Sequence, residues 1–219
     1  MKALTGEVQV FVYGANGHGK VVADIIRACG REVEGFVDDD PRRCNAALGL
    51  RVLGNGPWLA RQAADRPVAV VLGIGDNFCR REVTEQCCKA NIQILSAVHP
   101  SATVAPSATV LPGAVIMAHA VVNADAQIGP GSIINTAAVV EHDCNVGSFV
   151  HVSPRVALGG DVRVADLCWL GIGSIVLPGI KIGMGSIVGA GSTVLHDIDD
   201  WVVVVGTPAR ILKETVRRL

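Results

Sequence analysis

The stretch IGPGSIINTAAVVEHDCNV, residues 128–146, carries an aliphatic side chain at every sixth position from Ile128 to Val146. The same phase holds without a break from Val98 to Val194. A helix repeats its apolar face about every 3.6 residues and a strand about every 2, so a period of six fits neither alone. It indicates short strands joined by turns. Three such strands make one coil of about 18 residues, and stacked coils form a parallel β-helix.

Small side chains follow the aliphatic series at a fixed distance. Ala126, Ser132 and Cys144 each stand four positions after an aliphatic member. In a triangular prism the aliphatic residues fill the interior, small residues fit beside them, and Gly, Asn and Asp occupy the corners. A Val-rich sandwich is the alternative, but it would need turn signals about every 8 to 12 residues and would not keep one phase this long.

Length and composition exclude several classes. The 219 residues carry a net charge of −1 and no basic stretch, so we expect no nucleic-acid partner. No segment approaches about 18 consecutive apolar residues, and the start Met1–Glu7 lacks a signal peptide's apolar core. We therefore expect no membrane insertion and a cytoplasmic location. The seven cysteines include no CxxC pair, so reduced thiols are expected, with Cys144 and Cys168 as small core residues.

The first 97 residues follow a different pattern, in which strands alternate with helices. This alternation predicts a Rossmann-like α/β domain over residues 1–97, with a small parallel sheet and helices on both faces, ahead of a coil domain over residues 98–219. The expected strands are 8–13, 33–37, 68–74 and 92–95, and the expected helices are 20–29, 58–65 and 78–90.

Three loops of this domain should converge outside the carboxyl ends of the strands, where such sheets bind ligands. Free backbone N–H groups at a glycine turn before a helix favour an anion, although GxxGxG departs from the dinucleotide fingerprint GxGxxG. Acidic residues about 20 positions further on commonly bind a ribose, and a solvated turn before Pro41 is the alternative. The candidate residues are Asn16, Gly17 and His18 in the first loop, Asp38 and Asp39 in the second, and Gly75 in the third.

One coil carries polar residues in a region otherwise built of Val, Ala and Gly. His142 stands outside the core series, Asp143 follows it, and Gly160 comes one coil later. A missing side chain at Gly160 leaves room beside His142, and its N–H could point at a developing oxyanion. Taken alone, His142 would be a solvated surface histidine. Together with Asn135 and His151 nearby in sequence, the group favours a catalytic site.

Motifs in both halves of the chain match one family. They are YGANGHGK at 13–20, GFVDD at 35–39, INTAAVVEHDC at 134–144, HVSP at 151–154 and VGTPAR at 205–210. Together they resemble the left-handed β-helix acyltransferases that N-acetylate nucleotide-linked amino sugars, which are grouped with the sialic acid O-acetyltransferases of the NeuD type. The resemblance covers nearly the whole chain and implies a left-handed β-helix of hexapeptide repeats.

The resemblance also implies roles for residues of the coils. His142 would be the general base, and Asp143 would orient it and raise its basicity. His151, Ile172 and Ala190 would contact acetyl-CoA between neighbouring subunits of a homotrimer. We also assign Gly160 to the acetyl-CoA site and Asn135 to the acceptor site, and we expect no metal.

The loops of the first domain would hold the acceptor. The resemblance implies a 4-amino-4,6-dideoxy sugar on UDP or GDP, with GDP-perosamine preferred, and acetylation of its C4 amino group. It places Pro208, in the turn 206–209, near the adenine end of coenzyme A, with Arg210 or Lys213 available to the phosphates. Ile211 to Leu219 is expected to form a short C-terminal helix that caps the coils.

Three further functions remain open. O-acetylation of a sialic acid or another sugar is the main one. A zinc enzyme similar to the γ-type carbonic anhydrases would use His119, His142 and His151, but their spacing does not match and the first domain would be unexplained. A non-catalytic protein that binds nucleotide sugars is the third, because a fold does not fix a function.

Overall fold

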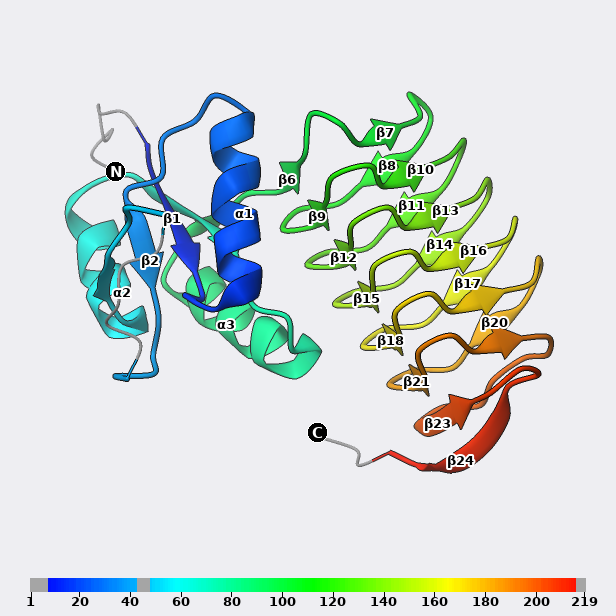
Figure 1. The fold of residues 1–219 in the computed structure, drawn as a ribbon. Coiled ribbons are helices and arrows are strands. Elements are labelled where there is room, and N and C mark those ends of the chain that lie inside the picture. The colour runs from blue at the N-terminus through cyan, green and yellow to red at the C-terminus, as the bar shows by residue number, and fades with distance from the viewer. Residues whose placement is uncertain (1–7, 43–47, 216–219) are drawn as a thin grey trace. The chain divides into compact units, whose positions relative to one another are not determined.

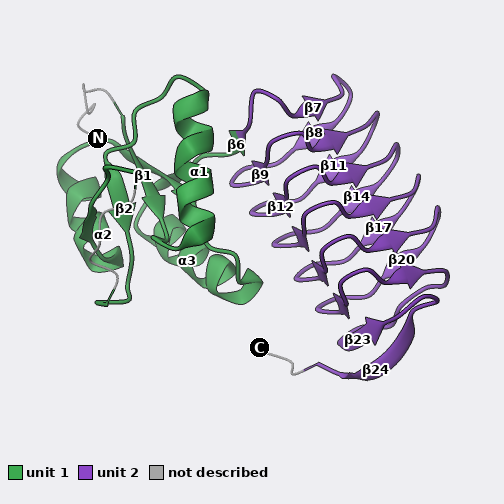
Figure 2. Cartoon of the chain, viewed as in Figure 1, with its two compact units in different colours: residues 1–97 green, residues 98–219 purple. Residues whose placement is uncertain are grey.

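The computed structural model describes residues 8–42 and 48–215. The chain forms two compact units, residues 1–97 and 98–219, shown in separate colours in Figure 2. The start Met1–Glu7, Cys44 and residues 216–219 lie outside the described residues, and so do the expectations that fall on them. Within the two described ranges, no helix combines the length and the apolar character that a membrane crossing needs.

The first unit is a doubly wound α/β fold around a five-stranded parallel sheet of order β3-β2-β1-β4-β5. Because crossover connections are right-handed, the strand order places α1 on one face of the sheet and α2 with α3 on the other. Its elements are β1 (Gln9–Tyr13), α1 (Gly17–Ala28), β2 (Gly35–Val37), β3 (Val52–Gly54), α2 (Gly56–Asp65), β4 (Val68–Leu72), α3 (Asn77–Lys89) and β5 (Gln93–Ile94).

The alternation of strands and helices was predicted correctly, but some boundaries differ. Helix α1 begins at Gly17, three residues before the expected start, because the last part of the glycine turn is already helical. The edge strand β3 was not predicted, since three residues carry too little pattern. Helix α2 begins at Gly56, where the side chain of Asn55 accepts a hydrogen bond from the Trp58 N–H and caps the helix.

Close backbone contacts explain the glycine turn. A Cβ on Gly19 would lie 1.8 Å from the carbonyl oxygen of Gly14. Gly14 has φ +109°, and a Cβ there would lie 2.6 Å from the oxygen of Gly73. Any side chain at either position would push α1 away from the ends of β1 and β4. The spacing GxxGxG therefore brings the start of α1 against the sheet.

The second unit is a left-handed parallel β-helix in which three sheets form the sides of a prism. Figure 1 shows the coils stacked one upon the next. One sheet contains β7 (Thr103–Val104), β10 (Val121–Val122), β13 (Val139–Val140), β16 (Ala157–Leu158), β19 (Ile175–Val176) and β22 (Thr193–Val194). A second contains β8 (Thr109–Val110), β11 (Gln127–Ile128), β14 (Asn145–Val146), β17 (Arg163–Val164) and β20 (Lys181–Ile182). The third contains β6 (Ala97–Val98), β9 (Val115–Ile116), β12 (Ile133–Ile134), β15 (His151–Val152), β18 (Trp169–Leu170), β21 (Ile187–Val188), β23 (Val202–Val205) and β24 (Arg210–Glu214).

The aliphatic series fills the prism, as the period predicted, with one exception. From Ile116 onward its members are buried, whereas Val98 is 37% exposed and does not belong to the core. No coil precedes Val98 in the stack. The small residues beside the series also bond to the next coil. Buried Ser132 donates through Oγ to the oxygen of Gly147 at 2.7 Å and accepts from the N–H of Val150 at 2.9 Å.

The corners follow the same period of six. The first residue of this series, Gly113, and the last, Gly191, both have positive φ, and so does every sixth residue between them. Gly and Asp occupy many of these corners, as expected, and Ala137 and Phe149 also adopt this conformation. From His119 onward each corner N–H donates to the preceding coil, for example from Ala137 to the oxygen of Ala118 at 3.0 Å. At the corners that are not glycine, these bonds offset a strain of about 1 to 2 kcal/mol per residue.

The expected C-terminal helix was also wrong over the residues described. Arg210–Glu214 forms strand β24, which runs antiparallel to β23. Arg, Leu, Lys and Glu are good helix formers, but tertiary contacts override intrinsic propensity, and β23 presents an open edge of backbone N–H and C=O groups at the end of the coils. Pairing with that edge decides the conformation of the segment.

Candidate active site

His142 lies in the exposed turn between β13 and β14. Its Nδ1 lies 2.8 Å from Oδ2 of Asp143, and the two side chains are 62% and 59% exposed. Asp143 is one of the corner residues, with φ +61°, and its N–H donates to the oxygen of Ala124 at 3.0 Å. The strained corner thus turns the carboxylate back toward the preceding side chain.

The two nitrogens of the His142 imidazole have different roles. The hydrogen bond to Asp143 is the main cause that raises the pKa of His142 above its ordinary value, and slight desolvation opposes it. With Nδ1–H donated to the carboxylate, Nε2 is left as the proton acceptor. One coil later, a Cβ on Gly160 would lie 2.6 Å from Nε2 and 2.5 Å from Cε1 of His142. The imidazole therefore packs directly against the backbone of Gly160, and the place that a side chain would take there is occupied by the ring itself.

Glu141 precedes the histidine and is fixed from the coil before. Nδ2 of Asn123 donates to Oε2 of Glu141 at 2.9 Å. Asn123 was not predicted, although it stands 18 residues before Glu141 and therefore occupies the same place one coil earlier. Glu141 adds a weaker contribution that raises the pKa of His142.

Asn135 and His151 meet on another side of the prism. Nδ2 of Asn135 lies 3.0 Å from Nε2 of buried His151, whose ring stacks on Trp169 with centroids 5.6 Å apart. Nε1 of Trp169 donates to Oγ of Ser153 at 2.9 Å. Trp169 was missed, although it stands 18 residues after His151 and pairs with it in register.

The His142 turn and this group belong to different sides of the prism. His142 follows a strand of one sheet, whereas His151 lies within a strand of another. Residues that are close in sequence lie on different sides of the prism because each coil side spans only six residues.

The residues assigned to acetyl-CoA include a column on the prism. Ile172 and Ala190 follow β18 and β21 in successive coils, and the N–H of Gly191 donates to the oxygen of Ile172 at 2.8 Å. Ile172 is 59% exposed and Ala190 is also exposed. Pro208 is exposed in the turn between β23 and β24, after a cis peptide bond. Arg210 and Lys213 are exposed on β24.

The first unit contains a crevice of about 370 Å³ at the carboxyl ends of its strands. The structure brings four of the six predicted residues to its lining, namely Asn16, Asp38, Asp39 and Gly75. The other two, Gly17 and His18, lie in the first turn of α1 and are not part of the lining. Arg80, which was not predicted, lies directly behind the Gly75 loop.

Both predicted aspartates already hold loops in place. Asp38 accepts hydrogen bonds from the N–H groups of Ala15 at 2.7 Å and Asp40 at 2.9 Å. Asp39 accepts from the Tyr13 hydroxyl at 2.7 Å and from the Gly56 N–H at 2.8 Å. Burial, followed by the hydrogen bond to Asp39, raises the pKa of Tyr13, which keeps the phenol protonated. Each carboxylate oxygen has a second lone pair that a ligand hydroxyl can use.

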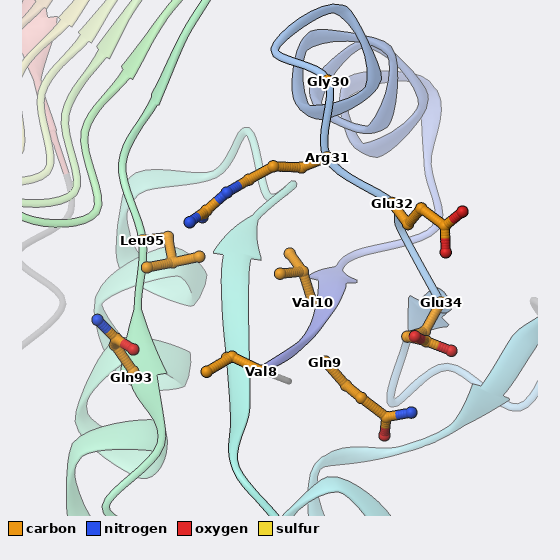
Figure 3. A pocket seen from close by; sticks show the side chains of 9 residues that line it. All are labelled: Val8, Gln9, Val10, Gly30, Arg31, Glu32, Glu34, Gln93 and Leu95. Carbon is orange, nitrogen blue, oxygen red and sulfur yellow. The ribbon is translucent and has the colours of Figure 1, made fainter. Parts of the chain in front are cut away.

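A larger cavity lies away from this chemistry. It measures about 530 Å³ and is lined by the starts of β1 and β5 and by the segment between α1 and β2. Figure 3 shows Arg31 and Gln93 among its side chains. It therefore lies at the amino ends of the strands, opposite the edge where parallel sheets bind ligands.

The described residues contain no cluster of three or more His, Cys, Asp or Glu side chains suited to a metal ion. His119, His142 and His151, which the zinc alternative requires, do not come together within one chain.

Comparisons with known proteins match both units. Residues 9–87 match the family model of the PglD N-terminal domain. A solved histidine-to-asparagine variant of perosamine N-acetyltransferase from Caulobacter crescentus, in complex with CoA and GDP-perosamine, is 39% identical, with a TM-score of 0.92. The match covers 95% of this chain and 99% of that one. The acetyltransferase domain of PglB from Neisseria gonorrhoeae, in complex with acetyl coenzyme A, is 36% identical, with a TM-score of 0.88 over 94% of this chain and 100% of that domain.

Among the curated relatives, some match nearly the whole chain and others match only a short part of it. GDP-perosamine N-acetyltransferase from Escherichia coli O157:H7 is 24% identical, over 93% of this chain and 96% of that protein. Galactoside O-acetyltransferase from Lactococcus lactis is 49% identical, but over only 24% of this chain and 26% of that protein. The chain thus spans about a quarter of the length of the latter relative.

Proposed function

The chain belongs to the hexapeptide-repeat sugar N-acetyltransferases, and from this premise we propose that it transfers the acetyl group of acetyl-CoA to the C4 amino group of a nucleotide-linked 4-amino-4,6-dideoxy sugar. GDP-perosamine is the preferred acceptor, and a UDP-linked equivalent is the alternative. The likeness to a perosamine N-acetyltransferase over both units supports this choice.

The observation that carries the proposal is the turn at His142. An exposed imidazole whose Nδ1 is held by Asp143, and whose ring packs against Gly160, has the geometry of an oriented general base that a substrate can reach from solvent. General-base catalysis of this kind contributes about 10² to 10⁴ in rate. His142 and Asp143 are therefore the proposed catalytic pair.

The proposed reaction uses Nε2 of His142 as the base and Asp143 as the acceptor of the Nδ1–H hydrogen bond. The sugar amine attacks the thioester carbonyl carbon of acetyl-CoA, which forms a C–N bond and a tetrahedral species with a cationic nitrogen. Nε2 of His142 takes a proton from this nitrogen, and Asp143 stabilises the imidazolium through Nδ1–H. The C–S bond then breaks, and the CoA sulfur leaves and takes up a proton. No cysteine is required, so the transfer is direct and the kinetics are sequential.

Acceptor and donor occupy separate places in this proposal. The crevice lined by Asn16, Asp38, Asp39 and Gly75 holds the nucleotide of the acceptor. Acetyl-CoA lies along the column that includes Ile172 and Ala190, with Pro208 near its adenine end. His151 and Gly160 contact the acetyl end of the donor, and Asn135 lies on the acceptor side.

We also propose a homotrimer. His142 and His151 lie on different sheets of the prism, and the family resemblance puts acetyl-CoA between neighbouring subunits, so we take one site to combine His142 of one subunit with His151 of the next. Closed cyclic symmetry then gives three identical sites.

An acceptor screen tests the proposed function. The wild-type protein is incubated with acetyl-CoA and a panel of GDP- and UDP-linked 4-amino sugars, their 4-hydroxy counterparts and sialic acid. We expect release of the CoA thiol and a product with one added acetyl group for a GDP-linked 4-amino sugar.

Hydroxylamine distinguishes the two kinds of product. An amide resists it, whereas an ester from O-acetylation is cleaved. A product that hydroxylamine cleaves, or acetylation of only the 4-hydroxy sugars, would contradict N-acetylation. The short match to a galactoside O-acetyltransferase makes this arm of the screen necessary.

A further inference from the structure

A fully buried arginine lies behind the crevice of the first unit. Arg80, in the first half of α3, has no exposed surface. Its guanidinium donates from Nη1 to the carbonyl oxygens of Ile74 at 2.9 Å and Gly75 at 3.0 Å, and from Nη2 to Oδ1 of Asn77 at 2.7 Å. One side chain therefore binds two carbonyl groups of the loop that joins β4 to α3 and the first residue of α3.

Burial of this guanidinium costs free energy. A buried cation loses its hydration, and replacement by an apolar residue of similar volume is often neutral or stabilising. Burial lowers the pKa of Arg80 to about 9, with the carboxylate of Asp76 acting in the opposite direction, so the group stays protonated at neutral pH. A planar fork of donors fixes several acceptors in one geometry, which an ammonium cannot do.

The bound loop is a wall of the crevice. Ile74, Gly75 and Asp76 contribute to its lining on the side away from the guanidinium. The other charged residues that line it are acidic, namely Asp38, Asp39 and Asp40, and no Lys, Arg or His belongs to the lining described. A nucleoside diphosphate would enter this crevice with its own negative charge. A cation directly behind the wall offsets part of that repulsion, because screening is weak in the interior.

We propose that Arg80 is a positioning residue for the nucleotide: it holds the Ile74–Asn77 loop in the shape that receives a nucleoside diphosphate, and it supplies a positive charge behind that loop. This inference rests on the proposed function, since it takes the crevice to be the nucleotide site. It assigns Arg80 no contact with the substrate and no part in the chemical step.

Equilibrium binding tests the proposal with GDP, UDP and CoA as separate probes. The variants are Arg80→Met, which removes the charge and the donors, and Arg80→Lys, which keeps the charge without the fork. Arg81→Met is the matched control, because Arg81 is the neighbouring residue of the same helix and its side chain is partly exposed near Glu85. Thermal unfolding and hydrogen exchange of residues 73–78 are measured for each variant.

We expect Arg80→Met to raise the Kd for GDP at least about tenfold, Arg80→Lys to raise it by less, and Arg81→Met to change it less than about twofold. The Kd for CoA should stay unchanged throughout, and exchange should accelerate in the 73–78 loop of the Arg80 variants. On activity, KM for the nucleotide sugar should rise while kcat stays nearly constant.

Three outcomes overturn the inference in different ways. If the wild type binds GDP and a folded Arg80→Met binds it within about twofold of the wild type, Arg80 does not position the nucleotide, although the proposed function stands. If Arg80→Met does not unfold cooperatively, Arg80→Lys decides, and wild-type affinity in that variant contradicts the proposal. If the wild type binds neither GDP nor UDP, the nucleotide site and the inference both fall.

Discussion

At the scale of single residues, the proposed chemistry depends on a contact between neighbours in sequence. His142 and Asp143 are both well exposed, so the hydrogen bond between them, rather than burial, sets the pKa of the imidazole. The sequence predicted this pair, because the two residues are adjacent and stand outside the core series. It could not predict the positive φ of Asp143, which depends on the bond to Ala124 in the preceding coil.

The pH dependence of the reaction follows from this contact. His142 must be neutral to accept a proton, so kcat/KM should rise as pH increases through its raised pKa. Asp143→Asn removes the carboxylate that is the main cause of the raised pKa. The acidic inflection of the pH profile should therefore move to lower pH, while kcat falls because the ring is less well oriented.

Asp125→Asn is the control for this measurement. Asp125 occupies the same corner one coil earlier, with φ +60°, and lies outside the groups that shift the pKa of His142. The acidic inflection of the Asp125→Asn pH profile should match that of the wild type. An unchanged inflection in Asp143→Asn would mean that Asp143 does not tune the base.

At the scale of elements, the period of six predicted every coil of the prism, because one apolar position per side is enough to fix a strand and a turn. The expectations for the two ends of the coil domain were wrong. Val98 has no preceding coil to cover it, and Arg210–Glu214 pairs with an open strand edge instead of forming a helix. Both failures depend on neighbours that a local pattern does not contain.

A substitution in the next coil tests the turn as a unit. In Gly160→Ala, the new Cβ would overlap Cε1 and Nε2 of His142. The exposed imidazole can rotate away, so the melting temperature should change little. Because the ring then leaves its place, kcat should fall at least about tenfold with little effect on KM.

Gly179→Asn is the matched control. Gly179 stands two coils after Asp143 in the same corner, with φ +74°, and a Cβ added there would meet no atom within 4 Å. Asn tolerates this backbone conformation, so activity should be unchanged. Equal activity of Gly160→Ala and the wild type would show that the packing of the His142 ring against Gly160 has no role.

At the scale of the whole molecule, the sequence indicated two parts and two binding places, because the pattern changes near His99 and because loops of a parallel sheet converge at one edge. It did not separate His142 from His151, since sequence proximity suggested one site. Only the stacking of coils shows that they lie on different sheets. Arg80 was missed for a similar reason, because nothing in the pattern of α3 marks it as buried.

Mixed oligomers test the shared site. We expect a trimer by light scattering, and low activity for His142→Ala and His151→Ala when each is purified alone. Co-expressed in equal amounts, the two variants should recover activity, because about a quarter of the interfaces in random cyclic trimers combine both native histidines. A fully active monomer, or no recovery in the mixture, would contradict a site built by two subunits.

The most direct test of the central claim is the kcat of His142→Ala with the acceptor that the wild type uses. The imidazole acts mainly in the transition state, so kcat should fall by about 10² to 10⁴ while the affinities for acetyl-CoA and the nucleotide sugar stay nearly intact. If the variant keeps more than about a tenth of the wild-type kcat, His142 is not the general base of this reaction.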